Sequence, residues 1–351
     1  MNTTNYISQT DLIHTKTVLV GFDGFIDSLF KIKRESHGEK LVYFDKIHSF
    51  GDYVQQKNTS FCLDVEEVTT KIGGNAPIVA NALGSLGLKT NLVGALGFPE
   101  TNPYFKSMSE NCQLYSVSEP GKASIYEFED GKIMFSNCSV LNNLDWTLLK
   151  EVIGLSTLIQ LFKSSDLFCL LNWSEIKGMT SILKGILEDI FPAIALQNKT
   201  TFFDLSDFSN RDKKEVETVI ELINEFAKHT KVVLSLNRNE AQTLHNILFE
   251  TTENNFFEQG KEIYKKLSVA ILVIHNAKET YVFENDLQVK SSPELIVNPM
   301  ISTGAGDHFN AGFCYGLLTD LELKECLALA NSVASYYIKT GISPNNNNLI
   351  K

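Results

Sequence analysis

The chain has 351 residues, of which 43% are hydrophobic, and its formal net charge at pH 7 is −11. A chain of this length and composition can bury a sizeable core in one large domain. The acidic balance argues against nucleic acid and anionic membrane surfaces as partners.

The sequence shows neither a targeting segment nor a membrane span. The N-terminal stretch MNTTNYISQTDLIHTK lacks the apolar core of a signal peptide, and no run reaches the roughly 18 to 20 apolar residues of a membrane helix. The six cysteines form no C-x-x-C pair, and most lie in apolar runs, as small core residues do. We therefore expect a cytoplasmic protein without disulfides or a transition-metal site.

Short β-rich runs alternate with helical runs over most of the chain. The strand-like runs are 17–22, 90–93, 167–171, 201–204, 232–236 and 270–275. The helical segments are 76–86, 148–162, 179–196, 213–229, 239–248 and 256–267. This alternation predicts an α/β fold with a mostly parallel sheet between two layers of helices, because each parallel connection needs a crossover.

Two segments, about 28–60 and 113–136, break this alternation. The second contains two alternating runs joined at Glu129-Asp130-Gly131, which is a hairpin signal. We expect these segments to form a small β lid inserted into one domain that spans residues 1–351. The asparagine-rich tail, 345–351, is predicted to be disordered.

The first candidate site residues follow the first strand, in GFDGFIDSLF at 21–30. Asp23 and Asp27 come directly after a run that is apolar enough to be a buried strand. A carboxylate at this point could accept hydrogen bonds from two hydroxyl groups of a sugar. Ordinary helix capping by the same two acids remains an equally good interpretation.

The second candidate element is KIGGNAPIVANALGSLG at 71–87. Gly73 and Gly74 precede a small, apolar helix, and their missing side chains would let a polyol lie against the backbone. Asn75 can both donate and accept hydrogen bonds. A plain turn between a strand and a helix is the alternative.

The third candidate element is VVLSLNRNE at 232–240, where a buried strand ends beside Asn237 and Glu240. Ligands of open α/β sheets bind at the carboxyl ends of strands. The pair could organise nucleotide phosphates and Mg²⁺, with Glu240 acting through water. A helix cap with an acidic first turn would use the same spacing.

The fourth element is ISTGAGDHFNAGF at 301–313. Gly304, Ala305 and Gly306 precede an apolar helical run, so their backbone N–H groups would form an anion site at the helix start. A carboxylate at Asp307 would repel phosphate, but it suits a general base that takes the proton of a substrate hydroxyl. Alternatively, Asp307 only stabilises the helix dipole and the glycines only pack.

Taken in this order, the four elements and the hairpin EPGKASIYEFEDGKIMF resemble the ribokinase-like (PfkB-type) carbohydrate kinases over nearly the whole chain. The resemblance implies a three-layer α/β/α kinase that uses ATP and Mg²⁺ to phosphorylate a hydroxyl of a small carbohydrate. It implies Asp307 as catalytic base and residues 304–306 as anion hole. It also implies Asn237 and Glu240 as organisers of Mg²⁺ and phosphate, and Asp27, Gly73 and Gly74 as substrate contacts.

The chain departs from the family pattern at several positions. Ile78 stands where the family often has Asn, a role that Asn75 could take, and Ile301 stands where it often has an Asp linked to a monovalent-cation site. The segment from His275 to Lys278 replaces the family's glycine-rich nucleotide loop, which makes those two residues candidate nucleotide contacts. The particular sugar and potassium activation are not decided by the sequence.

Two other functions remain open at this point. A nucleoside kinase on the same fold would need aromatic residues around the substrate, and Phe22, Phe25 and Tyr126 are available. A non-catalytic sugar- or nucleotide-binding regulator would agree with the altered nucleotide loop. In the resembled family the lid can also mediate homodimers.

Overall fold

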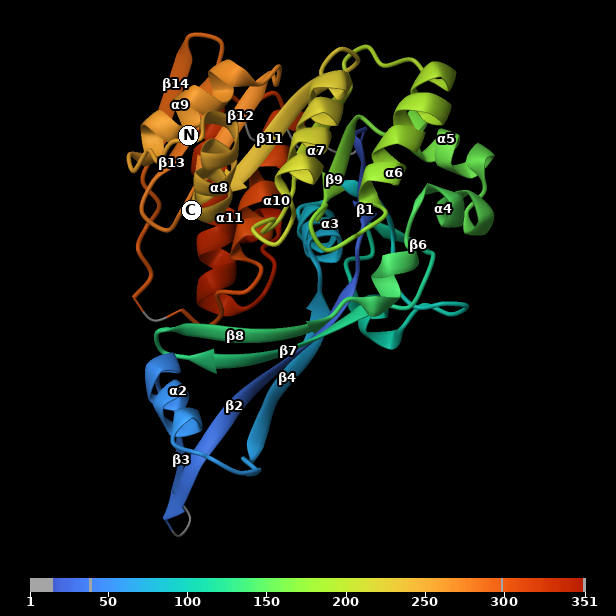
Figure 1. Ribbon diagram of the computed structural model, residues 1–351. Coiled ribbons are helices and arrows are strands. Elements are labelled where there is room, and N and C mark those ends of the chain that lie inside the picture. Colours follow the sequence, from blue (N-terminus) through green and yellow to red (C-terminus); the bar gives the residue numbers. More distant parts are fainter. Residues whose placement is uncertain (1–14, 38–39, 298, 350–351) are drawn as a thin grey trace.

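The computed structural model describes residues 15–37, 40–297 and 299–349, and their largest feature is a nine-stranded sheet (Figure 1). In spatial order the strands are β14 (Leu287–Ser291), β13 (Thr280–Glu284), β12 (Ile271–His275), β11 (Lys231–Asn237), β10 (Thr200–Asp204), β9 (Leu167–Leu171), β1 (Thr17–Phe22), β5 (Lys89–Gly94) and β6 (Cys112–Ser116). All pairs from β12 to β6 are parallel, whereas β13 and β14 add antiparallel strands at one edge. The prediction of a mostly parallel sheet is confirmed.

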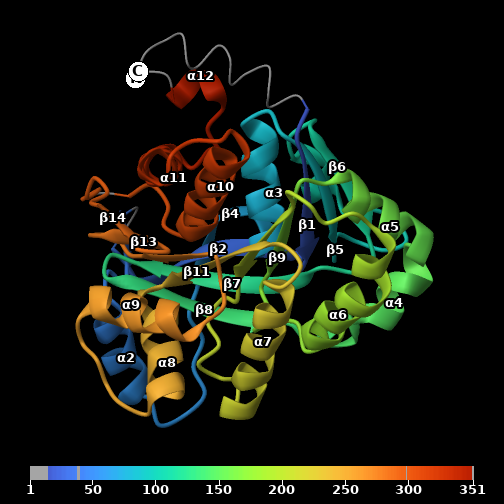
Figure 2. The ribbon, with the colours of Figure 1, turned by 90° about the horizontal axis from the view of Figure 1, so that it is seen from above.

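Helices cover both faces of this sheet (Figure 2). One face carries α4 (Trp146–Val152), α5 (Leu155–Ser164), α6 (Met179–Gly185), α7 (Lys213–Phe226), α8 (Arg238–Phe249) and α9 (Phe256–Lys266). The other carries α3 (Asn75–Ser85), α10 (Ala305–Leu318) and α11 (Leu323–Thr340). The central strands are apolar on both sides because each face packs on a helical layer, and every residue of β9 is buried.

Five strands form a second sheet, which extends away from the main body in Figure 1. They are β2 (Phe25–His37), β3 (Lys40–Tyr43), β4 (Val65–Gly73), β7 (Gly121–Phe128) and β8 (Gly131–Asn137), and we call them the lid sheet. Helix α2 (Ile47–Gln55) lies between β3 and β4 in sequence and contacts β8. Residues 113–116, which were predicted to be part of the lid, instead belong to strand β6 of the main sheet and pair with β5.

Two of the predicted helices are interrupted in the structure. The predicted helix 148–162 is divided at Gly154, whose φ of 85° ends α4 and begins α5. The predicted helix 179–196 is regular only to Gly185, followed by a π-helical turn and a 3-10 turn that contains Pro192. Proline lacks the N–H that a continuing α-helix would need.

The C-terminal tail differs from the prediction of disorder over its described part. Residues Asn346–Leu349 form the short helix α12. The Asn346 side chain donates to the Leu86 carbonyl at 2.9 Å, and the Tyr315 hydroxyl donates to Asn346 at 3.2 Å. Asn346, one of the asparagines that suggest low complexity, therefore bonds the tail to the end of α3 and to α10. The last two residues of the prediction lie outside the described part.

All six cysteines are free thiols, as the sequence predicts. Among the described residues, no helix is both long enough and apolar enough to cross a membrane.

A pair of glycine substitutions tests the packing of the α4–α6 layer. A Cβ on Gly185 would lie 2.2 Å from ring carbons of Trp146, whereas a Cβ on Gly51 in helix α2 would meet nothing within 4 Å. We expect Gly185→Ala to lower the free energy of unfolding by about 1 to 3 kcal/mol. Gly51→Ala should leave it unchanged or raise it by up to about 1 kcal/mol. Urea unfolding of both variants measures the difference, and equal stabilities would contradict the packing at Gly185.

Candidate active site

Polar residues gather where neighbouring strands of the main sheet reach their carboxyl ends. Asp23 follows β1, Asn172 follows β9, Asp204 ends β10 and Asn237 ends β11. In the order β11, β10, β9 and β1 these are four consecutive parallel strands, so their ends lie along one edge. This is the edge at which open α/β sheets bind ligands.

The start of helix α10 provides backbone donors at this edge. Gly304 is the N-cap with a left-handed φ of 92°, and it offers no side chain to cap the helix. The first helical N–H groups therefore have no side-chain acceptor, and the helix dipole adds partial positive charge. The helix begins at Ala305, so of the predicted turn at 304–306 only Gly304 precedes it, and the geometry of this helix start suits an anion.

Asp307 lies in the first turn of α10, half-buried, and faces a cavity. Asn75, the first residue of α3, donates its side-chain N–H to Asp307 Oδ1 at 2.9 Å. The cavity has a volume of about 170 Å³ and is lined by Phe25, Asp27, Gly74, Asn75, Ile78, Ala123, Met134, Ser136, Asn172, Glu175, Ser206, Thr303 and Asp307. The carboxylate is thus accessible from this cavity, which we call the smaller cavity, instead of being sealed in the core.

The surroundings of Asp307 make its carboxyl group a stronger base than an exposed aspartate. Burial is the main cause that raises its pKa well above the ordinary value, and the nearby carboxylates of Asp204 and Asp23 raise the pKa further. The hydrogen bond from Asn75 acts in the opposite direction, because it stabilises the ionised form.

Asp23 is fully buried and bonded to protein groups on all sides. Its carboxylate accepts hydrogen bonds from the backbone N–H of Asn75 at 2.9 Å, from that of Ala76 at 2.7 Å, and from the Asn172 side chain at 2.6 Å. Burial raises its pKa to about 6. Asp23 does not line the smaller cavity, so the structure places it behind the site, where it fixes the start of α3.

Asp27, on β2 of the lid sheet, does line the smaller cavity. A Cβ on Gly73 would lie 2.1 Å from Asp27 Oδ1, so only glycine leaves room for this carboxylate. Burial raises the pKa of Asp27 to about 6, although Lys71 and Lys132 lower it. Gly74 has a φ of 85°, which favours glycine, and it lies on the cavity wall.

Asn237 and Glu240 form a capping box at the start of α8. Asn237 Oδ1 accepts from the backbone N–H of Glu240, and a carboxylate oxygen of Glu240 accepts from the backbone N–H of Asn237 at 2.9 Å. Burial and the neighbouring Asp204 carboxylate raise the pKa of Glu240 well above its ordinary value. Asn237 and Glu240 thus form the helix cap that their spacing allowed. Asn237 also lines a second, larger cavity, which is described next.

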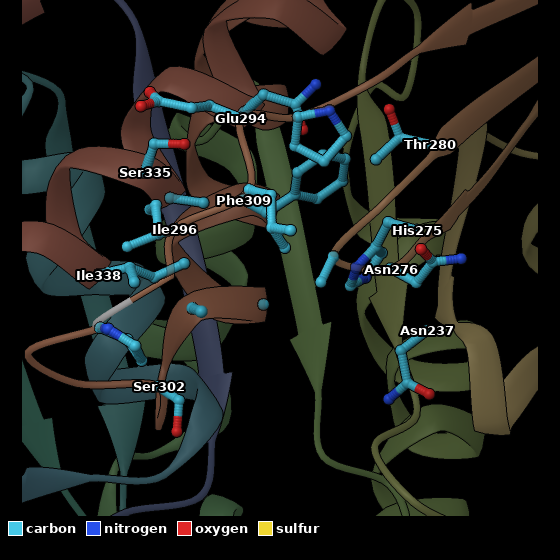
Figure 3. Close-up of a pocket in the computed structure, with 18 of the residues that line it drawn as sticks. Asn237, His275, Asn276, Thr280, Glu294, Ile296, Ser302, Phe309, Ser335 and Ile338 are labelled. Atoms are coloured by element: carbon cyan, nitrogen blue, oxygen red, sulfur yellow. The ribbon is translucent and has the colours of Figure 1, made fainter. Parts of the chain in front are cut away.

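A larger cavity of about 530 Å³ lies on the other side of the α10 start (Figure 3). His275, at the end of β12, stacks on Phe309 with ring centroids 4.6 Å apart, and burial lowers its pKa to about 4, so it is neutral near pH 7. Lys278 is exposed and does not line this cavity. The lining residues include Asn237, His275, Asn276, Ala277, Thr280, Ser302, Ala305, Gly306, Phe309, Ser335 and Ile338.

Several site residues were missed by sequence reasoning. Asn172 Oδ1 and Ser206 Oγ are buried without a hydrogen-bond partner among the described residues, and both residues line the smaller cavity. Both have left-handed backbones, with φ of 57° and 58°. Asn172 follows the apolar strand β9 by one residue, and Ser206 follows β10 by two. This position just after a buried strand was the signal that the sequence offered.

The fold is the one that solved structures of ribokinase-like kinases share. The ribokinase of Thermotoga maritima is 16% identical, with 95% of this chain and 97% of that chain covered and a TM-score of 0.64. The ribokinase of Arabidopsis thaliana, solved with ribose and ATP, has the same identity and coverage and a TM-score of 0.67. The adenosine kinase of Sinorhizobium meliloti, also 16% identical over the same shares, again has a TM-score of 0.67.

Sequence comparison narrows this class to one family. The model of the prokaryotic ketohexokinase family matches residues 8–351, and the chain belongs to that family. A ketohexokinase of Haloferax volcanii is 26% identical over 335 residues, which cover 93% of this chain and 88% of that protein. An uncharacterized sugar kinase of Archaeoglobus fulgidus is 32% identical over 112 residues, or 32% of this chain and 41% of that protein. The protein is thus an ATP-dependent sugar kinase.

Proposed function

We propose that the protein phosphorylates a hydroxyl group of a ketohexose, with Asp307 as the general base. One observation carries this proposal: the first turn of α10 stands between the two cavities. Ala305 and Gly306 line the larger cavity, whereas Thr303 and Asp307 line the smaller one. A phosphoryl group held at this turn would lie between a nucleotide on one side and an acceptor on the other.

The chemistry follows from this placement. Asp307 accepts the proton of the sugar hydroxyl while the hydroxyl oxygen forms a bond to the γ-phosphorus of ATP. The bond between the γ-phosphorus and the bridging oxygen breaks, and ADP leaves with that electron pair. The amides at residues 304–306 donate to the oxygens of the transferring group, where negative charge gathers. Because burial raises the pKa of Asp307, its carboxylate is a better proton acceptor than an exposed one.

The smaller cavity suits a polyol. Asp27 and Asn75 offer acceptors and donors, and the unpartnered Asn172 Oδ1 and Ser206 Oγ would be satisfied by sugar hydroxyls. Its volume of about 170 Å³ is below the range of about 300 to 1,000 Å³ that is usual for drug-sized ligands. A monosaccharide therefore fits this description better than a nucleoside does.

The larger cavity is proposed to bind ATP. It reaches the α10 amides at Gly306, and His275 and Phe309 give it an apolar wall. Asn276 lies on the same wall, and its buried side-chain N–H group has no partner among the described residues, so it is free to donate to the nucleotide. Lys278 would contribute only if its exposed side chain turned towards the site.

The residues present fit a Mg²⁺ ion that is carried mainly by the nucleotide. Within the described residues, no three His, Cys, Asp or Glu side chains are grouped as ligands of a metal ion. Mg²⁺ usually keeps waters and phosphate oxygens as ligands in such sites. We infer that Asn237, which lines the larger cavity, would hold its waters, that Glu240 would act indirectly through its hydrogen bonds to Asn237, and that the ion would neutralise phosphate charge.

We also propose that the enzyme is cytoplasmic and that two copies can form a dimer through their lid sheets. Free thiols are typical of a reducing compartment. The lid sheet exposes large apolar side chains, as a surface that contacts a second copy would. These are Val65 and Val68 on β4, and Phe135 on β8.

A panel of acceptors tests the proposed substrate. ADP release with ATP and Mg²⁺ is measured for ketohexoses, aldohexoses, ribose, sugar phosphates and nucleosides. We expect the highest kcat/KM with a ketohexose, because the family favours it and the small cavity suits a monosaccharide. A higher kcat/KM with a nucleoside would contradict the proposal and support the alternative on the same fold.

Replacing the base tests the role of Asp307. Asp307→Asn keeps the shape of the side chain but cannot accept the proton, so we expect kcat to fall at least about a hundredfold. The substitution also removes a buried acid with a raised pKa, so the thermal midpoint should not fall. Turnover near that of the unmodified protein would exclude Asp307 as the base.

The hydrogen bond from Asn75 makes the pH dependence testable. The Asp307 carboxylate must be ionised to act as base, so kcat falls on the acid side as the group becomes protonated. Asn75→Ala removes a bond that favours ionisation while keeping the backbone N–H that binds Asp23. We expect the pKa of Asp307 to rise, and the acid limb of the kcat profile to move up by about one pH unit.

Asn81→Ala is the matched control for this measurement. Asn81 lies on the same helix, and its side chain bonds to Ser343 and Ser109 instead of to the site. Its pH profile should match that of the unmodified protein. An unmoved acid limb in Asn75→Ala would show that Asp307 does not control the limb.

A further inference from the structure

Two lysines of the lid sheet reach the start of α10. Lys132, on β8, donates from its ammonium group to Thr303 Oγ1 at 2.8 Å. Lys71, on β4, donates to the Tyr337 hydroxyl at 3.0 Å, and this hydroxyl donates to the backbone carbonyl of Thr303 at 2.9 Å. Both contacts thus converge on Thr303, the residue immediately before the helix cap Gly304.

Neither ammonium group is neutralised by a direct partner. Within the described residues, no carboxylate lies within 4.0 Å of Lys71 or Lys132. Each ammonium carries three N–H donors and has one hydroxyl partner here. Lys71 is half-buried, and Lys132 is an exposed residue whose ammonium group lies against Thr303. Partial desolvation lowers the pKa of both lysines, whereas the more distant charges of Asp27, Glu127 and Asp307 favour the charged forms.

The site needs positive charge at this point. The Asp27 carboxylate raises the pKa of Asp23, and the carboxylates of Asp204, Asp23 and Asp27 raise the pKa of Asp307, so further negative charge would be opposed here. The transferring phosphoryl group brings such charge on its equatorial oxygens. The amides of α10 belong to the main body, and the lid sheet lines the same cavity through Asp27, Ala123, Met134 and Ser136.

We propose that Lys71 and Lys132 bind the oxygens of the phosphoryl group during its transfer, from the lid side of the α10 turn. This inference rests on the proposed function and adds two catalytic residues to it. The lysines belong to the lid and the amides to the main body, so the anion site is complete only while the two are in contact. Contact between the lid sheet and the main body therefore brings positive charge to the site and also excludes water.

A purely structural role is the competing explanation, in which the two lysines only fasten the lid to the main body. That role would affect how tightly both substrates are held. Charge at the transferring group would instead act mainly on the transition state, and it would lower kcat with little change in KM. The two explanations therefore predict different kinetic effects.

The kinetic test uses Lys71→Gln, Lys132→Gln and Lys132→Arg in the full-length protein. Lys122→Gln is the control, because Lys122 is an exposed lysine on the neighbouring strand β7. We expect each Gln variant to lose about a hundredfold in kcat, with the KM for the ketohexose changed less than about threefold. Lys132→Arg should recover part of kcat, and Lys122→Gln should match the unmodified protein.

A binding measurement provides the second readout. ADP with tetrafluoroaluminate and a ketohexose imitates the transferring group, and its stabilisation of the protein is measured by thermal shift. The Gln variants should lose most of this stabilisation while keeping that given by ADP alone. Asp307→Asn should still bind the mimic, since it leaves both lysines in place.

Several outcomes would overturn the inference. These are unchanged kcat in both Gln variants, a raised ketohexose KM with unchanged kcat, and full stabilisation by the mimic. In each case, ketohexose turnover by the unmodified protein would leave the proposed function intact. If the unmodified protein phosphorylated no ketohexose, the proposed function would fail, and the inference resting on it would fail too.

Discussion

The buried carboxylate of Asp23 is the interaction on which the geometry of the site depends. It accepts hydrogen bonds from two backbone groups at the start of α3 and from Asn172 after β9. A buried carboxylate without such partners would be strongly unfavourable, so these elements are held together. Because the start of α3 is fixed, Asn75 is placed to donate to Asp307 on α10. A residue that does not face the cavity therefore positions one that does.

Crowding of acids is the second feature that shapes the site. Asp27, Asp204, Glu240 and Asp307 all have a raised pKa, with burial as the largest cause in each case. Such a site can hold a phosphorylated nucleotide only if positive charge is supplied locally. The helix dipole and the amides at the start of α10 supply part of it, and the lid lysines add to it from the lid sheet. The net negative charge of the whole chain is compatible with an anionic ligand for this reason.

Much of the main body could be predicted from the sequence, because its strands are apolar runs and its connections are amphipathic helices. β9 was predicted with its observed bounds, since all of its residues are apolar and buried. The helix breaks at Gly154 and Pro192 were missed, because apolar periodicity continued across them. The placement of 112–116 in the main sheet depends on pairing with β5, and pairing between distant segments leaves no local signal.

The sequence by itself determined the α/β class, the turn at Gly304, and Asp307 as a carboxylate in the first turn of α10. These features depend on residue type and local spacing, which glycine, helix and strand preferences control directly. Only the tertiary structure decided that Asp23 lies behind the cavity, that Lys278 lies outside it, and that two lid lysines reach α10. These are contacts between residues distant in sequence, and they exist only once the sheets and helices are packed together.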